Sequence, residues 1–204
     1  MSATLAWEQT ELFGEALSLP MEFQHGEVDL FREGRVRVGW DQHGLRVHAK
    51  LTDDSVFSRS TEDGQPMWKL GDVFEIFAKV TDRDDYFELH MTPCGHRLQL
   101  HFPDNSVISQ IRDKMRTLEE MMVEAPVFDF LTRKTATGWE VLALVPTSTL
   151  DAERDSLAGT ELAVSFGRYD YADAASEPIL SSTTRHEELN FHRVHEWTVL
   201  EFEG

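Results

Sequence analysis

Residues 35–51 read RVRVGWDQHGLRVHAKL and alternate between apolar and polar side chains on both sides of a short turn. Val36, Val38 and Trp40 share one side of the first run, and the second run repeats the pattern after residues 41–44. A period of two residues is typical of a half-buried β-strand, and two such runs joined by a polar turn predict a β-hairpin. We therefore expect antiparallel β-structure to organise the fold.

Alternation of the same period recurs through the rest of the chain. It predicts further strands at 74–80, 87–91, 98–102, 127–131, 139–145, 162–166 and 197–202. Many short strands separated by turn residues are typical of a sandwich of two sheets. Because the sequence contains no internal repeat, no linker and no shift in composition, we predict a single all-β domain over residues 1–204.

One segment departs from this pattern and predicts a single added amphipathic helix over about 105–124. Its apolar residues recur at spacings of three and four, at Ile108, Ile111, Met115, Leu118 and Met122. Two heptads are too few for a convincing coiled coil, so packing against the sandwich is favoured over a dimer seam. The oligomeric state stays open.

The charge balance excludes one class of partner. The chain has 37 acidic and 19 basic residues, and its net charge of -18 repels the phosphate backbone of nucleic acids. No apolar run approaches the roughly 20 residues needed to cross a bilayer, so a membrane span is also excluded. Residues 1–12 lack the basic start and apolar stretch of a secretory signal. This predicts a cytoplasmic protein, or a secreted or periplasmic one if a signal has been removed.

Sequence motifs for catalysis and metal binding are incomplete. The segment 186–190, HEELN, has Asn190 where a zinc-protease motif needs its second histidine. His192 and His195 are spaced as a metal pair, but without a third ligand they are interpreted as surface or hydrogen-bonded residues. The single cysteine, Cys94, has no partner for a disulfide or a metal cluster. None of these motifs therefore completes a zinc site.

If two of the turns are four-residue loops, their lengths predict the registers of the central strands. A loop at 81–84 places Ile76 opposite Leu89, and a loop at 92–95 places Leu89 opposite Leu98. Both registers keep the apolar side chains on one face. The other face then carries rows formed by Glu75, His90 and Arg97, by Phe77, Glu88 and Gln99, and by Lys79, Tyr86 and His101.

This polar face suits a polyhydroxylated ligand. Carboxylates, amides and guanidinium groups offer paired donors and acceptors to sugar hydroxyls, and an aromatic ring covers the apolar face of a sugar. An ordinary solvated sheet face with cross-strand charge pairs is the alternative interpretation. Glu75 and Glu88 also supply the pair of carboxyl groups that a glycosidase uses.

Short motifs follow one another in a recognisable order along the chain. They are VRVGWD at 36–41, GLRV at 44–47, LTD at 51–53, MWKLGDVFEIF at 67–77, YFEL at 86–89, GWE at 138–140 and SFGR at 165–168. Their order resembles the family-9 carbohydrate-binding modules and their relatives, over residues 28–203. The resemblance implies an immunoglobulin-like β-sandwich that binds sugars without cleaving them.

The resemblance also implies roles for individual residues. Trp68 matches the first of two tryptophans that hold a sugar between them, and Glu75 follows it in the family's strand. Ser165 stands where the family usually has asparagine, and Arg168 matches its arginine. Residues 178–182 contain no second tryptophan, which predicts weak binding, on the order of millimolar.

Family members often hold structural calcium, and Asp82, Asp84 and Asp85 form a candidate calcium-binding turn. No other cofactor is expected. The leading prediction is non-catalytic carbohydrate binding by Trp68, Glu75, Glu88, His90, Arg97, Gln99, Ser165 and Arg168. The alternatives are a glycan-active hydrolase using Glu75 and Glu88, and a structural or protein-interaction module using the methionine-rich helix.

Overall fold

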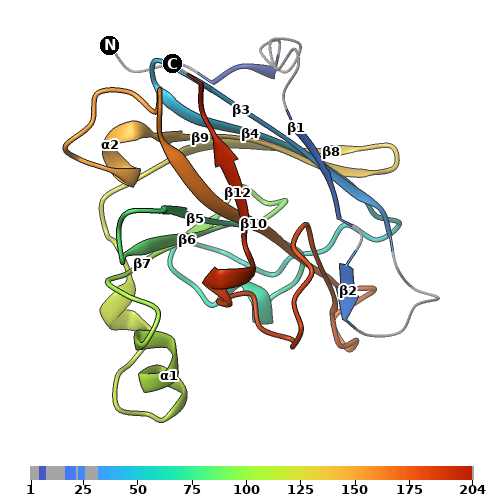
Figure 1. Cartoon of the computed structure of the whole chain (residues 1–204). Helices are drawn as coiled ribbons and strands as arrows, with labels where there is room; N and C mark the ends of the chain where they lie inside the picture. The colour runs from blue at the N-terminus through green and yellow to red at the C-terminus, as the bar shows by residue number, and fades with distance from the viewer. Residues whose placement is uncertain (1–4, 8–16, 22, 26–31, 204) are drawn as a thin grey trace.

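The computed structural model describes residues 5–7, 17–21, 23–25 and 32–203, and it shows two antiparallel sheets packed face to face (Figure 1). The first sheet has the strand order β1 (Leu17–Pro20), β3 (Gly34–Asp41), β4 (Gly44–Thr52), β9 (Gly138–Pro146) and β8 (Asp129–Thr135). The second sheet has the order β2 (Phe23–His25), β11 (Ile179–Ser182), β10 (Glu161–Asp170), β5 (Val73–Val80), β6 (Tyr86–Met91) and β7 (Arg97–Phe102). A further strand, β12 (Thr198–Glu201), also pairs with β10. The predicted two-sheet sandwich is confirmed.

Short helical turns connect the strands. They are η3 (Met67–Lys69), α1 (Val107–Arg112), η4 (Glu119–Met121), α2 (Thr147–Leu150) and η5 (Val194–Glu196). Within the described part of the chain, no helix combines the length and the apolar composition needed to span a membrane.

The hairpin predicted at residues 35–51 is formed by β3 and β4. Asp41 pairs with Gly44, so only two residues form the loop. Gly44 has a φ of +141°, and a Cβ there would lie 2.1 Å from the carbonyl oxygen of Val145 on the neighbouring strand β9. This position therefore requires glycine, because any side chain would push β9 away from β4.

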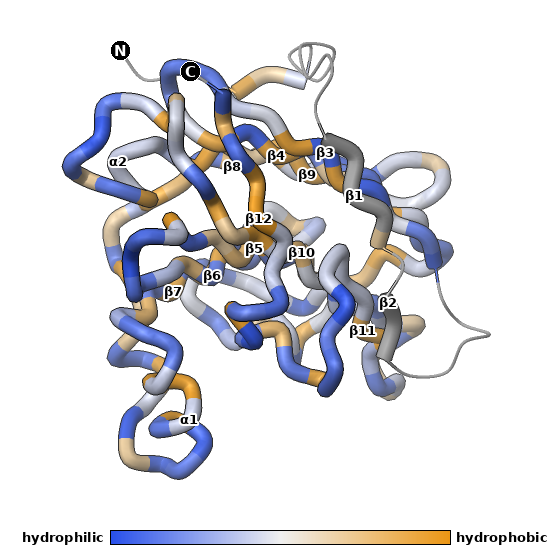
Figure 2. The backbone as a smooth tube through the Cα atoms, in the orientation of Figure 1, coloured by the Kyte–Doolittle hydropathy of each residue, from blue (hydrophilic) through white to orange (hydrophobic). Residues whose placement is uncertain are grey.

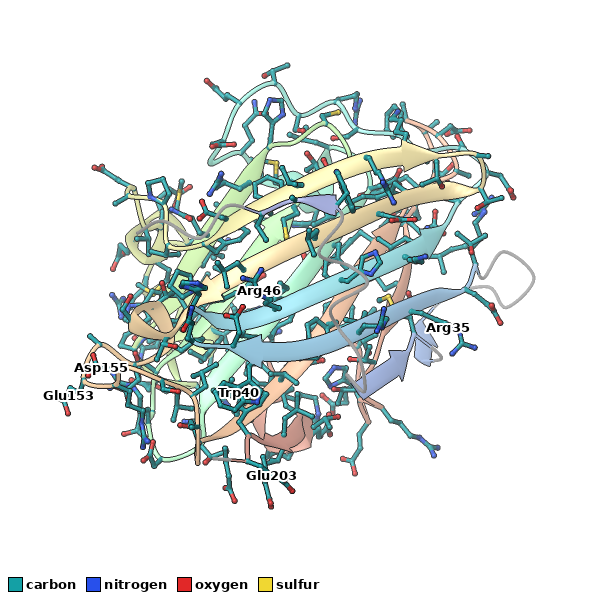
Figure 3. All side chains as sticks on the ribbon, turned by 90° about the horizontal axis from the view of Figure 1, so that it is seen from above. Arg35, Trp40, Arg46, Glu153, Asp155 and Glu203 are labelled. Carbon is teal, nitrogen blue, oxygen red and sulfur yellow. The ribbon has the colours of Figure 1, made fainter. Side chains whose placement is uncertain are left out.

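Facing side chains of the two sheets form the main core. It contains Leu45, Val47, Phe74, Ile76, Leu89, Trp139, Val141 and Phe166, all with 0 % exposure. Figure 2 shows hydrophobic segments concentrated in the strands and hydrophilic ones in the connecting loops. Figure 3 looks onto the outer face of the first sheet, where the guanidinium of Arg46 donates to Asp41 at 2.6 Å. The side chains of β4 on that face are polar, as the alternation predicts, whereas Leu142 and Leu144 of β9 share the face and are buried.

The added helix is shorter than predicted. α1 ends at Arg112, where the N–H of Lys114 donates to Ile111 and the N–H of Met115 donates to Gln110. These two bonds and the φ of 60° at Lys114 form a left-handed helix cap of the Schellman type. The chain then turns back and forms η4 as a separate piece. Two short helical pieces therefore replace the single helix expected over 105–124.

Three strands were not predicted from the sequence: β1, β2 and β11. They contain four, three and four residues respectively. Such segments are too short to show a period of two residues clearly. They extend the edges of both sheets without changing the class of the fold.

Candidate ligand-binding pocket

A pocket of about 670 Å³ lies on the outer face of the second sheet, which points away from the first sheet. Its floor comes from β5, β6, β7, β10 and β11, through Glu75, Phe77, Glu88, Leu98, Leu100, Tyr169 and Leu180. Its walls are η3 with Trp68, the segment from α1 to Met122, and the loop 189–192. In Figure 1, α1 and the loop before β12 both lie on this side of the second sheet. Both faces of this sheet are therefore covered.

The register of β5 and β6 agrees with the sequence prediction. Ile76 pairs with Leu89, Glu75 with His90, and Phe77 with Glu88. Since Ile76 and Leu89 point into the main core, the alternation directs the other side chains of these pairs to the pocket side. The predicted ionisable groups of β5 and β6 are therefore neighbours, but they are buried instead of forming an exposed flat platform.

The predicted register of β6 and β7 is wrong by one residue. Met91 pairs with Arg97, so the connecting loop has three residues instead of four. The N–H of Thr92 donates to the carbonyl oxygen of His96 at 3.0 Å, and Gly95 has a φ of +86°. A glycine in the left-handed conformation is what closes a three-residue hairpin loop.

This shift turns β7 over, so its leucines occupy the pocket face and its polar residues occupy the opposite face. The guanidinium of Arg97 donates to the carbonyl oxygen of Phe128 at 2.6 Å. The amide of Gln99 donates to two carbonyl oxygens of the segment 123–125, each at 2.7 Å. Both residues therefore anchor the connection to β8 and lie outside the pocket.

Ser165 and Arg168 also lie outside the pocket. Ser165 pairs with Phe77 and is fully buried. Arg168 points to the opposite face of β10 and has no exposed surface. Its Nη2 donates to the carbonyl oxygen of Thr52 at 2.8 Å and lies 3.1 Å from a carboxylate oxygen of Asp170. Arg168 therefore links the two sheets at one end of the sandwich.

Four ionisable side chains form a buried cluster at the floor of the pocket. Nε2 of His90 lies 2.6 Å from Oε1 of Glu88, and its Nδ1 lies 3.3 Å from Oε1 of Glu75. Nε2 of His192, from the loop 189–192, lies 3.7 Å from Oε2 of Glu88. His90 therefore connects the two carboxyl groups, and the loop adds a second imidazole beside one of them.

Burial and charge determine the protonation of this cluster. Burial outweighs the charge of His90 and raises the pKa of Glu75 to about 8. Burial opposes ionisation of Glu88 as well, but the charges of His192 and His90 hold its pKa below the ordinary value. Burial also disfavours the imidazolium of His90, yet the two carboxyl groups raise its pKa. Burial therefore favours the protonated form of Glu75, whereas mutual attraction favours the ionised forms of Glu88 and His90.

Trp68 is half-buried at the edge of the pocket, on η3. Its ring centroid lies 5.6 Å from that of His90, in an edge-on arrangement. The hydroxyl of Tyr171 donates to the carbonyl oxygen of Trp68 at 2.5 Å and so holds this turn in place. The structure therefore places Trp68 next to the ionisable cluster, as one wall of the same pocket.

Comparisons with solved structures identify the architecture, whereas no protein-family model and no curated protein sequence matches the chain. A Bacteroides uniformis protein to which carbohydrate binding is attributed aligns over 100% of this chain and 95% of its own, with a TM-score of 0.73 and 16% identity. A family-9 carbohydrate-binding module from Caldicellulosiruptor kristjanssonii, solved with cellotriose, aligns over 100% of this chain and 91% of its own, with a TM-score of 0.69 and 13% identity. A family-9 module from the same organism, solved with glucose, aligns over 100% of this chain and 93% of its own, with a TM-score of 0.69 and 11% identity. The fold is that of the family-9 modules.

Within this family-9 fold, sequence reasoning missed the residues of the loop 189–192. Phe191 packs over Gly167, where a Cβ would lie only 3.0 Å from its ring. His192, interpreted from the sequence as a surface or hydrogen-bonded residue, lines the pocket and lies 3.0 Å from the hydroxyl of Tyr86. A signal was present: Phe77 and Tyr86 are apolar or aromatic residues on a face predicted to be polar. They indicate that something covers this face.

Two groups of side chains on the family-9 scaffold have donor atoms close enough to hold a metal ion. The atoms of each group lie within 4.8 Å of one another; the groups are Glu75 with Glu88 and His90, and Asp53 with Asp72 and Asp170. In the turn predicted to bind calcium, Asp85 instead pairs with Arg83 at 2.8 Å and Asp82 with Arg154 at 3.4 Å. Two of its three carboxylates are thus directed at basic side chains.

Proposed function

We propose that this protein binds carbohydrate, without cleaving it, in the pocket on the outer face of the second sheet. The observation that carries the proposal is the combination of the Trp68 ring with the Glu75, Glu88 and His192 groups in one pocket of about 670 Å³. Its volume lies within the roughly 300–1,000 Å³ of typical small-molecule sites. The fold it shares with modules solved in complex with glucose and cellotriose supports the same class of ligand.

The chemistry of the floor suits sugar hydroxyls. A protonated Glu75 both donates and accepts hydrogen bonds, whereas the ionised Glu88 accepts them. Among the described residues, Oε2 of Glu88 has no hydrogen-bond partner, and Glu88 lines the pocket, so a ligand hydroxyl would satisfy a buried polar atom. Trp68 would cover the apolar face of the ring. With a single stacking tryptophan, affinity should be on the order of millimolar, or about 4 kcal/mol.

Binding is favoured over cleavage by the position of His90. A glycosidase needs its scissile bond between two carboxyl groups, and the imidazole of His90 contacts both Glu75 and Glu88. The space between the two groups is therefore filled by protein. Release of nitrophenol from a chromogenic glucoside, abolished in Glu88→Gln, would instead establish the hydrolase alternative.

Calorimetric titration with glucose, cellotriose and a panel of other monosaccharides tests the proposal. We expect saturable binding to at least one sugar, and loss of that binding in Glu75→Leu, which removes the donor and the acceptor. Glu153→Leu is the control, because Glu153, labelled in Figure 3, is exposed and does not line the pocket. No binding to any sugar up to tens of millimolar would refute the proposal.

A further inference from the structure

The pocket is chemically divided between its two sides. Its buried ionisable groups lie on β5, β6 and the loop 189–192, and β7 contributes only leucines. The other charged residues that line it, Lys69, Arg112 and Glu119, are exposed. The segment from α1 to Met122 covers β7, and Leu100 forms a β-bridge with Met122. This side of the pocket, the aliphatic side, is formed by Leu98, Leu100, Ile108, Ile111, Leu118 and Met122.

Polar groups near the aliphatic side are few and partly engaged. Arg112 donates to the side-chain oxygen of Asn190 at 2.8 Å, which closes one part of the rim. Glu119 is exposed at the surface. A second sugar placed here would bury hydroxyls against aliphatic side chains, and a buried hydroxyl without a partner costs free energy. The aliphatic side therefore disfavours a continuing sugar chain.

Exposed apolar side chains lie at the mouth of the same pocket. Met122 is 37 % exposed and Leu189 is 60 % exposed, and both line the pocket. They account for two of the four large hydrophobic side chains found exposed among the described residues. Apolar groups gathered at an opening are typical of sites that receive an apolar ligand group.

We infer that the ligand is a glycoside with an apolar aglycone, that is, a sugar joined to an alkyl or aryl group. The sugar contacts Trp68, Glu75 and Glu88, and the aglycone lies against Leu98 and Ile111. This inference rests on the proposed function for the sugar end of the pocket. It adds the chemical class of the group attached to the sugar.

The test compares two probes with the same sugar. Methyl β-glucoside and octyl β-glucoside, the latter below its micelle-forming concentration, are titrated into the full chain by calorimetry. Burial of two methylene groups accounts for about a tenfold gain in affinity. We therefore expect octyl β-glucoside to bind at least about tenfold more tightly than methyl β-glucoside. Octanol alone should bind more weakly than octyl β-glucoside.

Two variants on the same segment test whether the higher affinity for octyl β-glucoside comes from the aliphatic side. Ile111→Ser removes an aliphatic side chain that lines the pocket, whereas Met115→Ser changes a side chain that is 68 % exposed and does not line it. Ile111→Ser should reduce the octyl-to-methyl affinity ratio at least about fivefold. Met115→Ser should keep the ratio, with both variants folded by circular dichroism.

The outcomes separate this inference from the proposed function. Equal affinities for the two glucosides, or an octyl-to-methyl affinity ratio unaffected by Ile111→Ser, would overturn the inference of an apolar aglycone. Either result would leave the proposed sugar binding intact. Octanol binding as tightly as octyl β-glucoside, with no binding of methyl β-glucoside, would overturn both, because the sugar would then contribute nothing. Binding of neither glucoside would overturn this inference, and it would overturn the proposed function as well only if no other sugar of the panel binds.

Discussion

The two faces of the second sheet are equally buried but differ in what covers them. Ile76 is 0 % exposed against the first sheet, and its neighbour Glu75 is 2 % exposed on the other side. The inner face meets the other sheet, and the facing side chains form the main hydrophobic core. The outer face meets loops and short helical turns, which leave a pocket with ionisable groups beneath it. Burial of a residue therefore does not distinguish the core from the pocket. The two faces differ in whether a sheet or a set of loops packs on them.

This comparison predicts that the inner face tolerates truncation least. Trp139 has no exposed surface and belongs to the main core. Trp139→Ala should lower the free energy of unfolding by about 3–5 kcal/mol, because it leaves a cavity that two packed sheets cannot close. Urea unfolding measures the loss. A loss below about 1 kcal/mol would show that the inner face is loosely packed.

On the outer face, the largest effect should come from removing one partner of the buried ion pair. His90→Leu leaves Glu88 buried without its 2.6 Å partner and should cost about 3 kcal/mol at pH 7. The double variant His90→Leu with Glu88→Leu should recover part of that loss, since no charge then remains unpaired. His195→Leu, at a residue with 67 % side-chain exposure, is the control and should be near neutral in urea unfolding.

The pH dependence of stability tests the burial of Glu75 on the outer face. Its folded pKa of about 8 lies above the unfolded value of 4.5, so the folded state holds a proton that the unfolded state releases between these pH values. Stability should therefore fall as pH rises from 5 to 8, and the raised pKa of His90 acts in the same direction. Glu75→Gln should reduce this fall by on the order of 2 kcal/mol.

The measurement is thermal or urea unfolding of both proteins across this pH range. Asp72, whose pKa burial raises to about 7, remains in the variant and preserves part of the slope. Equal slopes in wild type and Glu75→Gln would mean that Glu75 is already ionised in the folded protein.

The smallest effect on stability is expected at the pocket wall. Trp68 is half-buried, so Trp68→Ala should cost less than about 1.5 kcal/mol while abolishing sugar binding. Melting temperature and calorimetric titration, measured side by side with Trp139→Ala, separate the two roles. If Trp68→Ala melts as early as Trp139→Ala, then Trp68 belongs to a second core instead of a ligand site.

The same contrast explains what the sequence could predict. Alternation reports which side chains point inward, so the hairpin 35–51, the main strands and the core position of Trp139 were predictable. The pairing of Glu75 with His90 also followed, because the register of these two strands was predicted correctly. Alternation carries no information about what covers the other face, and that cover comes from segments distant in sequence.

Two physical details account for the errors in the candidate site. A left-handed Gly95 shortens one loop by a residue, which moves Arg97 and Gln99 out of the pocket and puts leucines in their place. Arg168 follows the family's motif in sequence, yet it lies between the sheets. Of the predicted site, Trp68, Glu75, Glu88 and His90 come together, and only the structure adds His192.

The connection between β7 and β8 is attached to the sandwich without being part of its core. Gln99 holds the end of this connection by its contacts with residues 123–125, so the segment 103–122 is attached at defined points. This segment supplies one whole wall of the pocket and contributes nothing to the core between the sheets. We therefore expect insertions, deletions or exchanges in this segment to reshape the pocket while the sandwich folds as before.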